Sequence, residues 1–397
     1  MTRGHPFPFP DHPGLLPAPG YARLPQLPAF VQVTLPSGTD ALLARRHEDV
    51  RQVLTDPRFS RSAAAGFGLT SRSSESLALN AVDAPDHTRR RGVIAPYFTR
   101  ARAVRLQPET ARLASSLLAS MTSHDPPGDL MTEFAIPLAM GVVSSVLGIP
   151  AQEARELRPW AERMMCTTAF SRAEVKSAHQ SMYGYFEELL SRRTSAGHGV
   201  LGELAAAAAE RGEITSTEAV HLAYGLLLAG YETTSNQLGM CALLLAQNPA
   251  LASWLRREPA LLPAAIEEML RWTSLNATGG VPHSALCPVK IGATLIAAGQ
   301  VVIPVTDGAN RDPAVFRCPD QLRLGRPRNQ HLSFGHGRHR CLGAALARME
   351  LEVALSVLLT SLPGLALDAP EEQLHWRTGM YVRGVWNLPV RWQPPTG

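Results

Sequence analysis

One segment of the chain carries the residues best suited to chemistry. It reads His331-Leu-Ser-Phe-Gly-His-Gly-Arg-His-Arg-Cys341-Leu-Gly, and apolar residues at helical spacing follow it over residues 344–359. This pattern predicts a loop that leads into a helix, with Cys341 at the first turn of that helix. Free N–H groups and the positive end of the helix dipole favour a thiolate there. An isolated thiolate is a good axial ligand for haem iron.

Cys341 taken alone allows two other interpretations. A lone cysteine is most often a small, buried, apolar residue. His331, His336, His339 and Cys341 also form a set of nitrogen and sulfur donors that could bind zinc. Tight zinc sites, however, seldom have several glycines and a phenylalanine between their ligands. Three glycines of this loop allow backbone conformations and close approaches that a side chain would block: Gly335, Gly337 and Gly343.

The loop as a whole resembles the cysteine-ligand loop of the cytochrome P450 family, the haem-thiolate monooxygenases. Phe334-Gly-His-Gly-Arg-His-Arg-Cys341-Leu-Gly matches that highly specific motif. Three further segments fit the family in the right order, so the resemblance spans roughly residues 20–395. It implies haem b (iron protoporphyrin IX) as cofactor, with Cys341 as the ligand to its iron. The loop residues that it places against the haem are Phe334, Gly335, His339, Cys341 and Gly343.

A second segment, Ala229-Gly-Tyr-Glu-Thr-Thr234, lies midway along the longest expected helix. Gly230 costs that helix about 0.5–1 kcal/mol relative to alanine. We expect the missing side chain to open a notch for a ligand, served by a threonine hydroxyl that is spared from intrahelical bonding. Alternatively, Gly230 is only a close helix-packing contact and Glu232 a solvated charge. The resemblance implies that Ala229 and Gly230 face the haem, and that Glu232 and Thr233 are the catalytic pair that delivers protons during oxygen activation.

The two propionates of a haem need cationic or N–H partners where they are buried. Residues 83–91 resemble the family's haem-contacting helix, which implies His87 and Arg91 as partners together with His339. The alternative is a solvated, basic start of a helix. Relatives often have arginine where this chain has His283, which can donate a hydrogen bond but whose charge depends on pH.

Glu268-Met-Leu-Arg271 places opposite charges three residues apart, which is commonly a surface pair worth a few tenths of a kcal/mol. In the family an E-x-x-R pair is buried beneath the haem loop, so the resemblance implies a structural role here. The family commonly adds an arginine further along the chain, where this sequence has Gln321. We therefore expect His336 or Arg323 to complete the network.

The elements that must position these residues form a mainly α fold with a minor β region. The pattern is mainly helical over residues 108–362. The longest helix should begin at the capping box Thr215-Ser-Thr-Glu218 and run to Gln247, just before Asn248-Pro249. We expect a helix over residues 47–55 and strand-like segments over residues 30–35, 40–44, 289–305 and 381–391. The proline-rich residues 1–30 should wrap the surface, and residues 1–397 should form one haem-thiolate monooxygenase domain.

Composition limits the class of protein. The 397 residues are 45% hydrophobic and 18% charged with a net charge of +4, which excludes disordered, collagen-like and disulfide-scaffold proteins. A charge this small argues against a nucleic-acid binder, and no uncharged apolar stretch reaches about 18 residues. Five cysteines without a C-x-x-C pair argue against a zinc ribbon or an iron–sulfur cluster. We therefore expect a soluble, cytoplasmic monomer that binds neither nucleic acid nor membrane.

The electrons for such an enzyme should come from a partner. Nothing in the chain resembles a flavin or nicotinamide site, so we expect a separate ferredoxin, reduced by a ferredoxin reductase with NAD(P)H. Arginines crowd two regions and predict a basic surface that would steer an acidic ferredoxin; the alternative is that they only keep the surface soluble. These residues are Arg89, Arg90, Arg100, Arg102, Arg105, Arg338 and Arg340.

The resemblance also places variable, substrate-facing segments at residues 63–79, 164–170, 276–280 and 380–381 and just before Ala229. These segments are rich in small and apolar residues. They favour a bulky, largely apolar small molecule, and the C-terminal half looks most like bacterial enzymes that hydroxylate or epoxidise polyketides such as macrolides. The expected reaction inserts one atom of O2 into a C–H or C=C bond. Two alternatives remain open: oxidative coupling or ring formation without oxygen insertion, and a non-enzymatic haem sensor or carrier.

Overall fold

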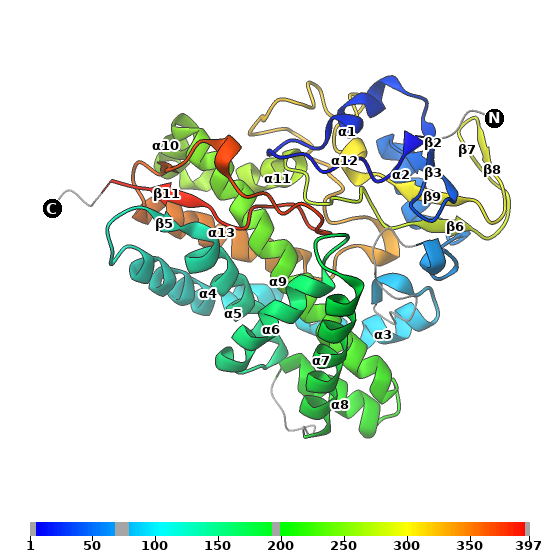
Figure 1. The fold of residues 1–397 in the computed structure, drawn as a ribbon, viewed down its shortest axis with the longest axis horizontal. Helices are drawn as coiled ribbons and strands as arrows, with labels where there is room; N and C mark the ends of the chain where they lie inside the picture. The colour runs from blue at the N-terminus through cyan, green and yellow to red at the C-terminus, as the bar shows by residue number, and fades with distance from the viewer. Residues whose placement is uncertain (1–4, 68–78, 193–198, 394–397) are drawn as a thin grey trace.

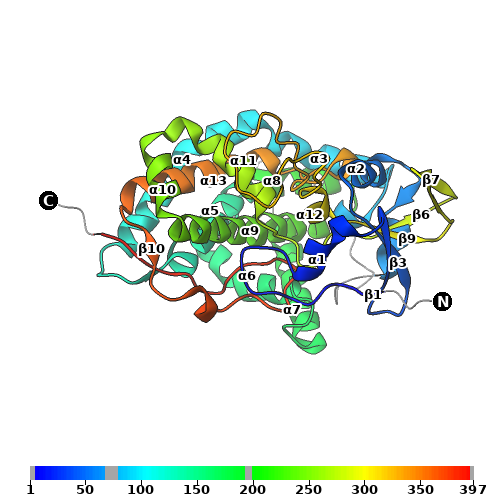
Figure 2. The same cartoon turned by 90° about the horizontal axis from the view of Figure 1, so that it is seen from above.

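The computed structural model describes residues 5–67, 79–192 and 199–393. Helices dominate, the largest sheet lies at one end of the molecule, and the small sheet of β5, β10 and β11 lies toward the other end (Figures 1 and 2), which confirms the mainly α class with a minor β region. The helices are α1 Pro19–Arg23, α2 His47–Thr55, α3 Asp86–Ile94, α4 Arg100–Met121, α5 Ile136–Leu147, α6 Ala151–Met164, α7 Arg172–Ser191, α8 Gly199–Ala209, α9 Ser216–Gln247, α10 Pro249–Arg257, α11 Leu262–Trp272, α12 Thr306–Ala309 and α13 Ala344–Ser361. The strands are β1 His5–Pro6, β2 Phe30–Thr34, β3 Asp40–Ala44, β4 Phe59–Ser60, β5 Gly128–Asp129, β6 His283–Ala285, β7 Val289–Ile291, β8 Thr294–Ile296, β9 Val301–Pro304, β10 Ala366–Leu367 and β11 Pro389–Arg391.

Helix α9 crosses the middle of the molecule (Figure 2). It begins as predicted, because the Thr215 hydroxyl accepts a hydrogen bond from the Glu218 N–H at 3.1 Å and the Glu218 carboxylate accepts one from the Thr215 N–H at 2.8 Å. It ends at Gln247, before Pro249. Its 32 residues make it roughly 48 Å long. One long element therefore contacts most of the other large helices, from α5 to α8 and also α10 and α13.

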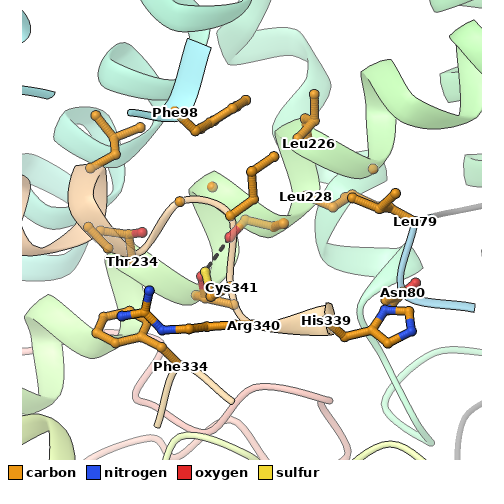
Figure 3. Close-up of a pocket in the computed structure, with 18 of the residues that line it drawn as sticks. Leu79, Asn80, Phe98, Leu226, Leu228, Thr234, Phe334, His339, Arg340 and Cys341 are labelled. Carbon is orange, nitrogen blue, oxygen red and sulfur yellow. Dashed lines mark hydrogen bonds between the residues drawn. The ribbon is translucent and has the colours of Figure 1, made fainter. Parts of the chain in front are cut away.

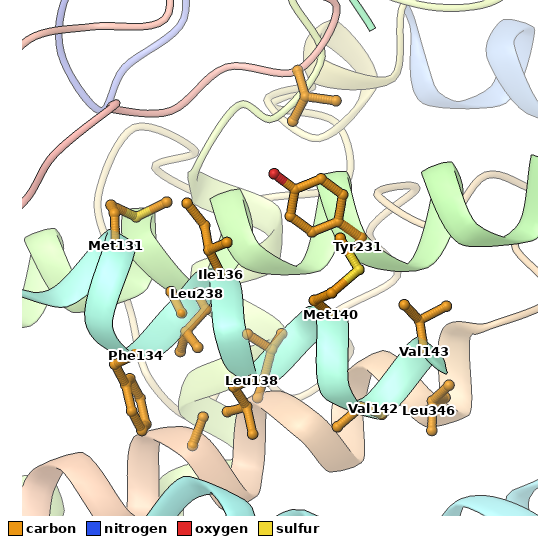
Figure 4. Close-up of a cluster of buried hydrophobic side chains, with 14 of the residues drawn as sticks. Met131, Phe134, Ile136, Leu138, Met140, Val142, Val143, Tyr231, Leu238 and Leu346 are labelled. Carbon is orange, nitrogen blue, oxygen red and sulfur yellow. The ribbon is translucent and has the colours of Figure 1, made fainter. Parts of the chain in front are cut away.

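Helix α5 packs between α9 and α13 (Figure 4). Its sequence, Ile-Pro-Leu-Ala-Met-Gly-Val-Val-Ser-Ser-Val-Leu, is apolar on almost every face, as expected for a helix buried on all sides. Leu138 and Val142 are buried in the same apolar cluster as Tyr231 of α9 and Leu346 of α13. This three-helix contact fixes the spacing between α9 and α13, the two helices that carry the main site motifs.

The largest sheet has the strand order β1-β2-β3-β9-β6-β4. Strand β3 pairs with β9 in parallel, and β4 pairs with β6 in antiparallel register with Ser60 opposite Ser284. The strands predicted at residues 30–35 and 40–44 are confirmed as β2 and β3. The segment 289–305 divides into β7, β8 and β9, and only β11 forms within residues 381–391. The sheet brings residues near 60 beside residues near 284.

The start of the chain contributes to the core. Phe7, Tyr21 and Leu24 are buried, and Phe7, Phe9 and Tyr21 form edge-to-face ring pairs. The expectation that residues 1–30 only wrap the surface is therefore wrong for these positions, because aromatic side chains between the prolines pack against the sheet.

No single helix within the described ranges is both long enough and apolar enough to cross a bilayer, although two pairs of consecutive helices reach that length together across sharp bends.

Candidate haem site

A cavity of about 370 Å³ lies between α9 and the loop that precedes α13 (Figure 3). Its walls come from several separate parts of the chain: residues near 61–98, α9, residues 270–276, the cysteine loop with the start of α13, and the isolated positions Val143, Met165, Thr306, Asp307 and Tyr381. Most of the residues predicted to contact a cofactor line it: His87, Arg91, Ala229, Gly230, Thr233, Phe334, His339, Cys341 and Gly343. Three predicted site residues are not on its wall: Glu232, His283 and Gly335.

The cysteine loop presents Cys341 to this cavity. The Cys341 N–H donates to the Phe334 carbonyl at 2.8 Å, which closes the loop. Gly337 has φ +70°, and a Cβ there would lie 2.5 Å from the Leu54 carbonyl oxygen, so this position requires glycine. Gly335 has φ +68° and shapes the turn without reaching the cavity.

Cys341 lies just before helix α13, since Gly343 is the N-cap and the helix begins at Ala344. The prediction that the cysteine occupies the first helical turn is therefore wrong by three residues. Its thiol opens into the cavity but is surrounded by protein, and this desolvation raises the thiol pKa. A hydrogen bond from the Gly343 N–H and the positive charge of Arg91 act in the opposite direction. The N-terminus of α13 thus still donates to the sulfur, as the sequence suggested.

The zinc alternative is not supported. His331 binds Glu267 at 2.9 Å and His336 accepts from Arg51 at 3.4 Å, so these two imidazoles have partners elsewhere. Within the described ranges, no group of three or more His, Cys, Asp or Glu side chains could hold a metal ion. Cys341 is left as a single sulfur donor, which suits the axial position of haem iron.

Two histidines on the wall have unused nitrogen atoms. The rings of His87 and His339 lie 4.1 Å apart, and the Nε2 atom of each is buried without a hydrogen-bond partner. Desolvation lowers the pKa of His87 to about 4 and that of His339 to about 2, so both are neutral at pH 7. Arg91 donates to the Arg340 carbonyl at 2.9 Å and also lines the cavity. Buried polar atoms of this kind need partners, and the carboxylates of haem propionates would supply them. The donor set therefore fits haem.

His283 lies behind the wall of the cavity. It is buried, and its Nε2 accepts a hydrogen bond from Arg61 Nε at 3.2 Å. Arg61 lines the cavity, whereas His283 does not. That His283 contacts the haem stays a prediction. Arg61 was not identified from the sequence, because its neighbours Phe59 and Ser60 belong to no recognisable motif. The one signal in the sequence was His283, a histidine where the resemblance led us to expect arginine.

Gly230 is explained by helix packing. A Cβ at this position would lie 2.5 Å from Val143 Cγ2 on α5. The close approach of α5 therefore requires a glycine at this position, which agrees with the alternative interpretation of a helix-packing contact. The presence of Gly230 can be explained without the predicted ligand notch. The Thr233 hydroxyl donates to the Ala229 carbonyl at 2.6 Å, so it is not spared from intrahelical bonding. Its oxygen can still accept a hydrogen bond, and Thr233 lines the cavity.

Glu232 is neither a solvated charge nor a residue of the cavity wall. Its fully buried carboxylate forms an ion pair with Arg377, which is also buried. Desolvation outweighs the effect of Arg377 and raises the pKa of Glu232 to about 7. Its Oε2 atom has no hydrogen-bond partner. Glu232 therefore changes its protonation state close to neutral pH, as a residue that handles protons should.

Glu268 and Arg271 form the buried structural pair that the resemblance implies. Two hydrogen bonds of 2.8 Å join them, and neither side chain is more than 1% exposed. The network is completed by Arg326, whose Nε donates to Glu268 at 2.8 Å. Arg323 takes part only through its main-chain N–H, also at 2.8 Å. The expectation of a side-chain contact from His336 or Arg323 is thus wrong, because the loop after Gln321 returns Arg326 to the same carboxylate.

Glu350 was not identified from the sequence. It lies on α13, lines the cavity and is almost fully buried, and its Oε1 atom has no hydrogen-bond partner. Desolvation raises its pKa to about 8, so the carboxyl group is mostly protonated at pH 7. No local motif distinguishes this glutamate from a solvated one.

The predicted basic surface is smaller than expected. Arg89 and Arg90 both form ion pairs with Glu218 at 2.7 Å, and Arg89 also pairs with Asp86 at 2.9 Å, so their charges are largely neutralised. Arg100, Arg102 and Arg105, at the start of α4, are exposed, as is Arg340 of the cysteine loop, and Arg338 is half-buried. The start of α4 and the cysteine loop therefore carry the positive charge that remains available to a partner.

Each predicted substrate segment supplies at least one wall residue. Leu79, Met165, Leu228, Asn276 and Tyr381 line the cavity. Residues 68–78 of the first segment lie outside the described residues.

Comparison with known proteins agrees with this geometry. The sequence profile of the cytochrome P450 family matches residues 139–363. The nocardicin C N-oxygenase of Nocardia uniformis subsp. tsuyamanensis is 39% identical over 97% of this chain and 98% of its own length. The mycinamicin IV hydroxylase/epoxidase of Micromonospora griseorubida is 37% identical over 99% of this chain and 100% of its own length. A solved structure of HinD with NMFT and NO covers 99% of this chain and 100% of that one, with 41% identity and a TM-score of 0.94. The chain therefore belongs to the cytochrome P450 family of haem-dependent oxidoreductases.

Proposed function

We propose that this cytochrome P450 inserts one oxygen atom of O2 into a C–H or C=C bond of a bulky, largely apolar secondary metabolite, polyketide- or macrolide-like in class. The second oxygen atom leaves as water, and the reaction consumes two electrons and two protons. The observation that carries this proposal is the cavity itself. Its wall includes Cys341 and Thr233, and leucines from α9 and from position 79 add apolar surface. A haem sensor or carrier would not require Thr233 and Glu232 beside such a cavity.

The residues of the chain have separate tasks in this proposal. Haem iron held by a thiolate supplies the oxygen-activating chemistry. Cys341 holds the iron, while His87, Arg91 and His339 hold the propionates. Thr233 Oγ1 moves protons into the cavity, and Glu232 supplies them because its pKa lies near 7. The apolar wall keeps water away from the reacting bond.

The electrons are proposed to come from a separate ferredoxin and its NAD(P)H-dependent reductase. Support comes from the exposed arginines at the start of α4, which would attract an acidic partner. This steering should weaken as salt is added. That the protein is a single domain, monomeric and cytoplasmic stays a prediction.

The substrate class is supported by the wall and by a relative. Leu79, Leu226 and Leu228 contribute apolar surface, and Asn276 and Tyr381 add a few polar groups. Such a combination suits a large apolar molecule with a few oxygen or nitrogen functions. The name of the mycinamicin IV hydroxylase/epoxidase describes reactions of the proposed type.

Two measurements test the proposal in sequence. The reduced protein exposed to carbon monoxide should give the red-shifted absorption band of a thiolate-bound haem, and its absence would remove Cys341 from the iron. A metabolite library is then screened for compounds that shift the haem spectrum, and hits are incubated with NAD(P)H and a surrogate ferredoxin system. A product that gains one oxygen supports insertion, whereas loss of two hydrogens assigns oxidative coupling or ring formation. Spectral binding without any turnover would favour a carrier.

A further inference from the structure

Arg61 is a buried cation on the cavity wall that forms no ion pair with any residue the structure describes. Arg61 is 9% exposed and lines the cavity. In the part of the chain that the structure describes, no carboxylate lies within ion-pair distance of its guanidinium. Desolvation accordingly lowers the pKa of Arg61 to about 10. Burying a cation without a counter-charge is unfavourable, so this position calls for an anion.

Neutral groups hold the guanidinium in place. Strands β4 and β6 pair with Ser60 opposite Ser284, so continuing the antiparallel register sets Arg61 beside His283. His283 Nδ1 must donate to the Val281 carbonyl at 2.9 Å, which leaves Nε2 to accept from Arg61 Nε at 3.2 Å. Arg61 Nη1 also donates to the Asn80 carbonyl at 3.3 Å. The Asp83 carboxylate accepts from the Arg61 main-chain N–H at 3.1 Å and acts on the guanidinium only from a distance. These groups orient the guanidinium but form no ion pair with it.

Arg61 lines the same cavity as the two histidines with unused nitrogens. The rings of His87 and His339 lie 4.1 Å apart, so the two imidazoles and the guanidinium share this part of the wall. His87 Nε2 and His339 Nε2 are buried without partners. A cation and two buried ring nitrogens therefore gather on one part of the wall, and they match a carboxylate-bearing ligand.

We propose that Arg61 is the cation that pairs with a haem propionate in this protein, and that His283 is a positioning residue that holds Arg61 from behind. His283 lies beside Arg61 on the adjacent strand, and Arg61 is the member of this pair that brings a positive charge to the cavity wall. The proposal rests on haem binding in this cavity and does not depend on which substrate is oxidised.

The test measures how tightly the holoprotein keeps its haem. We expect Arg61→Gln to transfer haem to excess apomyoglobin roughly ten- to hundredfold faster than wild type, because a hydrogen bond to a charged group is lost. Arg61→Lys keeps the charge and should stay within about fivefold of wild type. Adding His283→Arg to Arg61→Gln should restore slow transfer. Arg58→Gln is the matched control, since Arg58 lies nearby on the same segment, is half exposed and pairs only with Asp56.

A second readout separates propionate binding from a merely structural role. Resonance Raman propionate-bending bands report hydrogen bonding to the carboxylates, and we expect them to shift in Arg61→Gln and to shift less in Arg61→Lys. Unchanged bands together with unchanged haem transfer would overturn the proposal, as would failure of His283→Arg to rescue a folded Arg61→Gln protein. If Arg61→Gln does not fold, the propionate-bending bands of Arg61→Lys are compared with those of wild type. Identical bands would then overturn the proposal. A wild-type protein that holds no thiolate-bound haem would instead refute the proposed function.

Discussion

The buried pair between Glu232 and Arg377 makes a quantitative prediction possible. Their side chains are 0% and 1% exposed, and the Arg377 guanidinium lies 4.1 Å from the centre of the Trp386 ring. We consider Arg377→Met, which keeps a long unbranched side chain over the ring and removes the charge. The variant leaves Glu232 buried without its partner.

The loss in free energy of unfolding caused by Arg377→Met should depend on pH. The pKa of Glu232 is raised from its ordinary value of 4.5 to about 7 in the folded protein. A raised pKa means that the folded state holds its proton more tightly than the unfolded state, so this contribution to stability is complete below pH 4.5 and declines as pH rises through 7. Arg377 lowers this pKa, so its removal raises the value further.

The magnitude follows from these values. At pH 5.5 Glu232 is protonated in both proteins, and Arg377→Met should cost about 1 kcal/mol, the value of one hydrogen bond. At pH 8 wild-type Glu232 is ionised while the variant retains its proton, which adds about 1.4 kcal/mol for the one pH unit above 7. The total at pH 8 is then about 2.4 kcal/mol.

Urea unfolding of the haem-bound protein, followed by far-ultraviolet circular dichroism at pH 5.5 and 8, measures both values. The matched control is the same substitution in a Glu232→Gln background, where no carboxyl group titrates. Arg377→Met should there cost about 1 kcal/mol at both pH values. A cost that does not change with pH in the wild-type background, or that changes equally in the control background, would refute the reasoning.

Three further predictions concern single positions. Thr233→Ala should retain haem and substrate binding but yield less product per NAD(P)H consumed, with the difference recovered as hydrogen peroxide; unchanged coupling would exclude Thr233 from proton delivery. Gly230→Ala should lower the free energy of unfolding by about 1–3 kcal/mol, because its Cβ would meet Val143 Cγ2 at 2.5 Å, and adding Val143→Ala should restore most of that loss; a Gly230→Ala protein as stable as wild type would contradict the packing explanation. Glu350→Gln should gain stability relative to wild type by about 1.4 kcal/mol per pH unit from pH 6 to 8, because burial raises the Glu350 pKa to about 8; parallel stability curves for the two proteins would contradict the shift.

The features that the sequence predicted well are local. The capping box at Thr215 needs only residues three positions apart, and it set the start of α9 correctly. The cysteine loop is likewise continuous, so Cys341, Phe334 and His339 could be assigned together. Glycine at position 337 was expected for its backbone freedom, and the contact with the Leu54 carbonyl gives the physical reason.

The features that the sequence did not predict depend on pairs far apart in the chain. Arg61 meets His283 only because β4 and β6 are neighbours in the sheet. Arg377 meets Glu232 across 145 positions. Spacing along the chain cannot show such pairs, and a single sequence offers no covariation to reveal them. For Gly230 the sequence offered helix packing only as an alternative, because the residue it meets, Val143, belongs to another helix.

The scattered origin of the cavity wall constrains how the protein matures. Its sides come from residues near 61–98, from α9 and from residues 270–276, while the sulfur proposed to hold the iron comes from residue 341 and one further wall residue from position 381. A ribosome therefore releases the apolar sides of this pocket long before the cysteine emerges. During that interval the nascent chain exposes leucines that only later face the cofactor, a condition that invites aggregation. Haem loading through Cys341 would accordingly come after the ribosome has made the chain at least as far as residue 341.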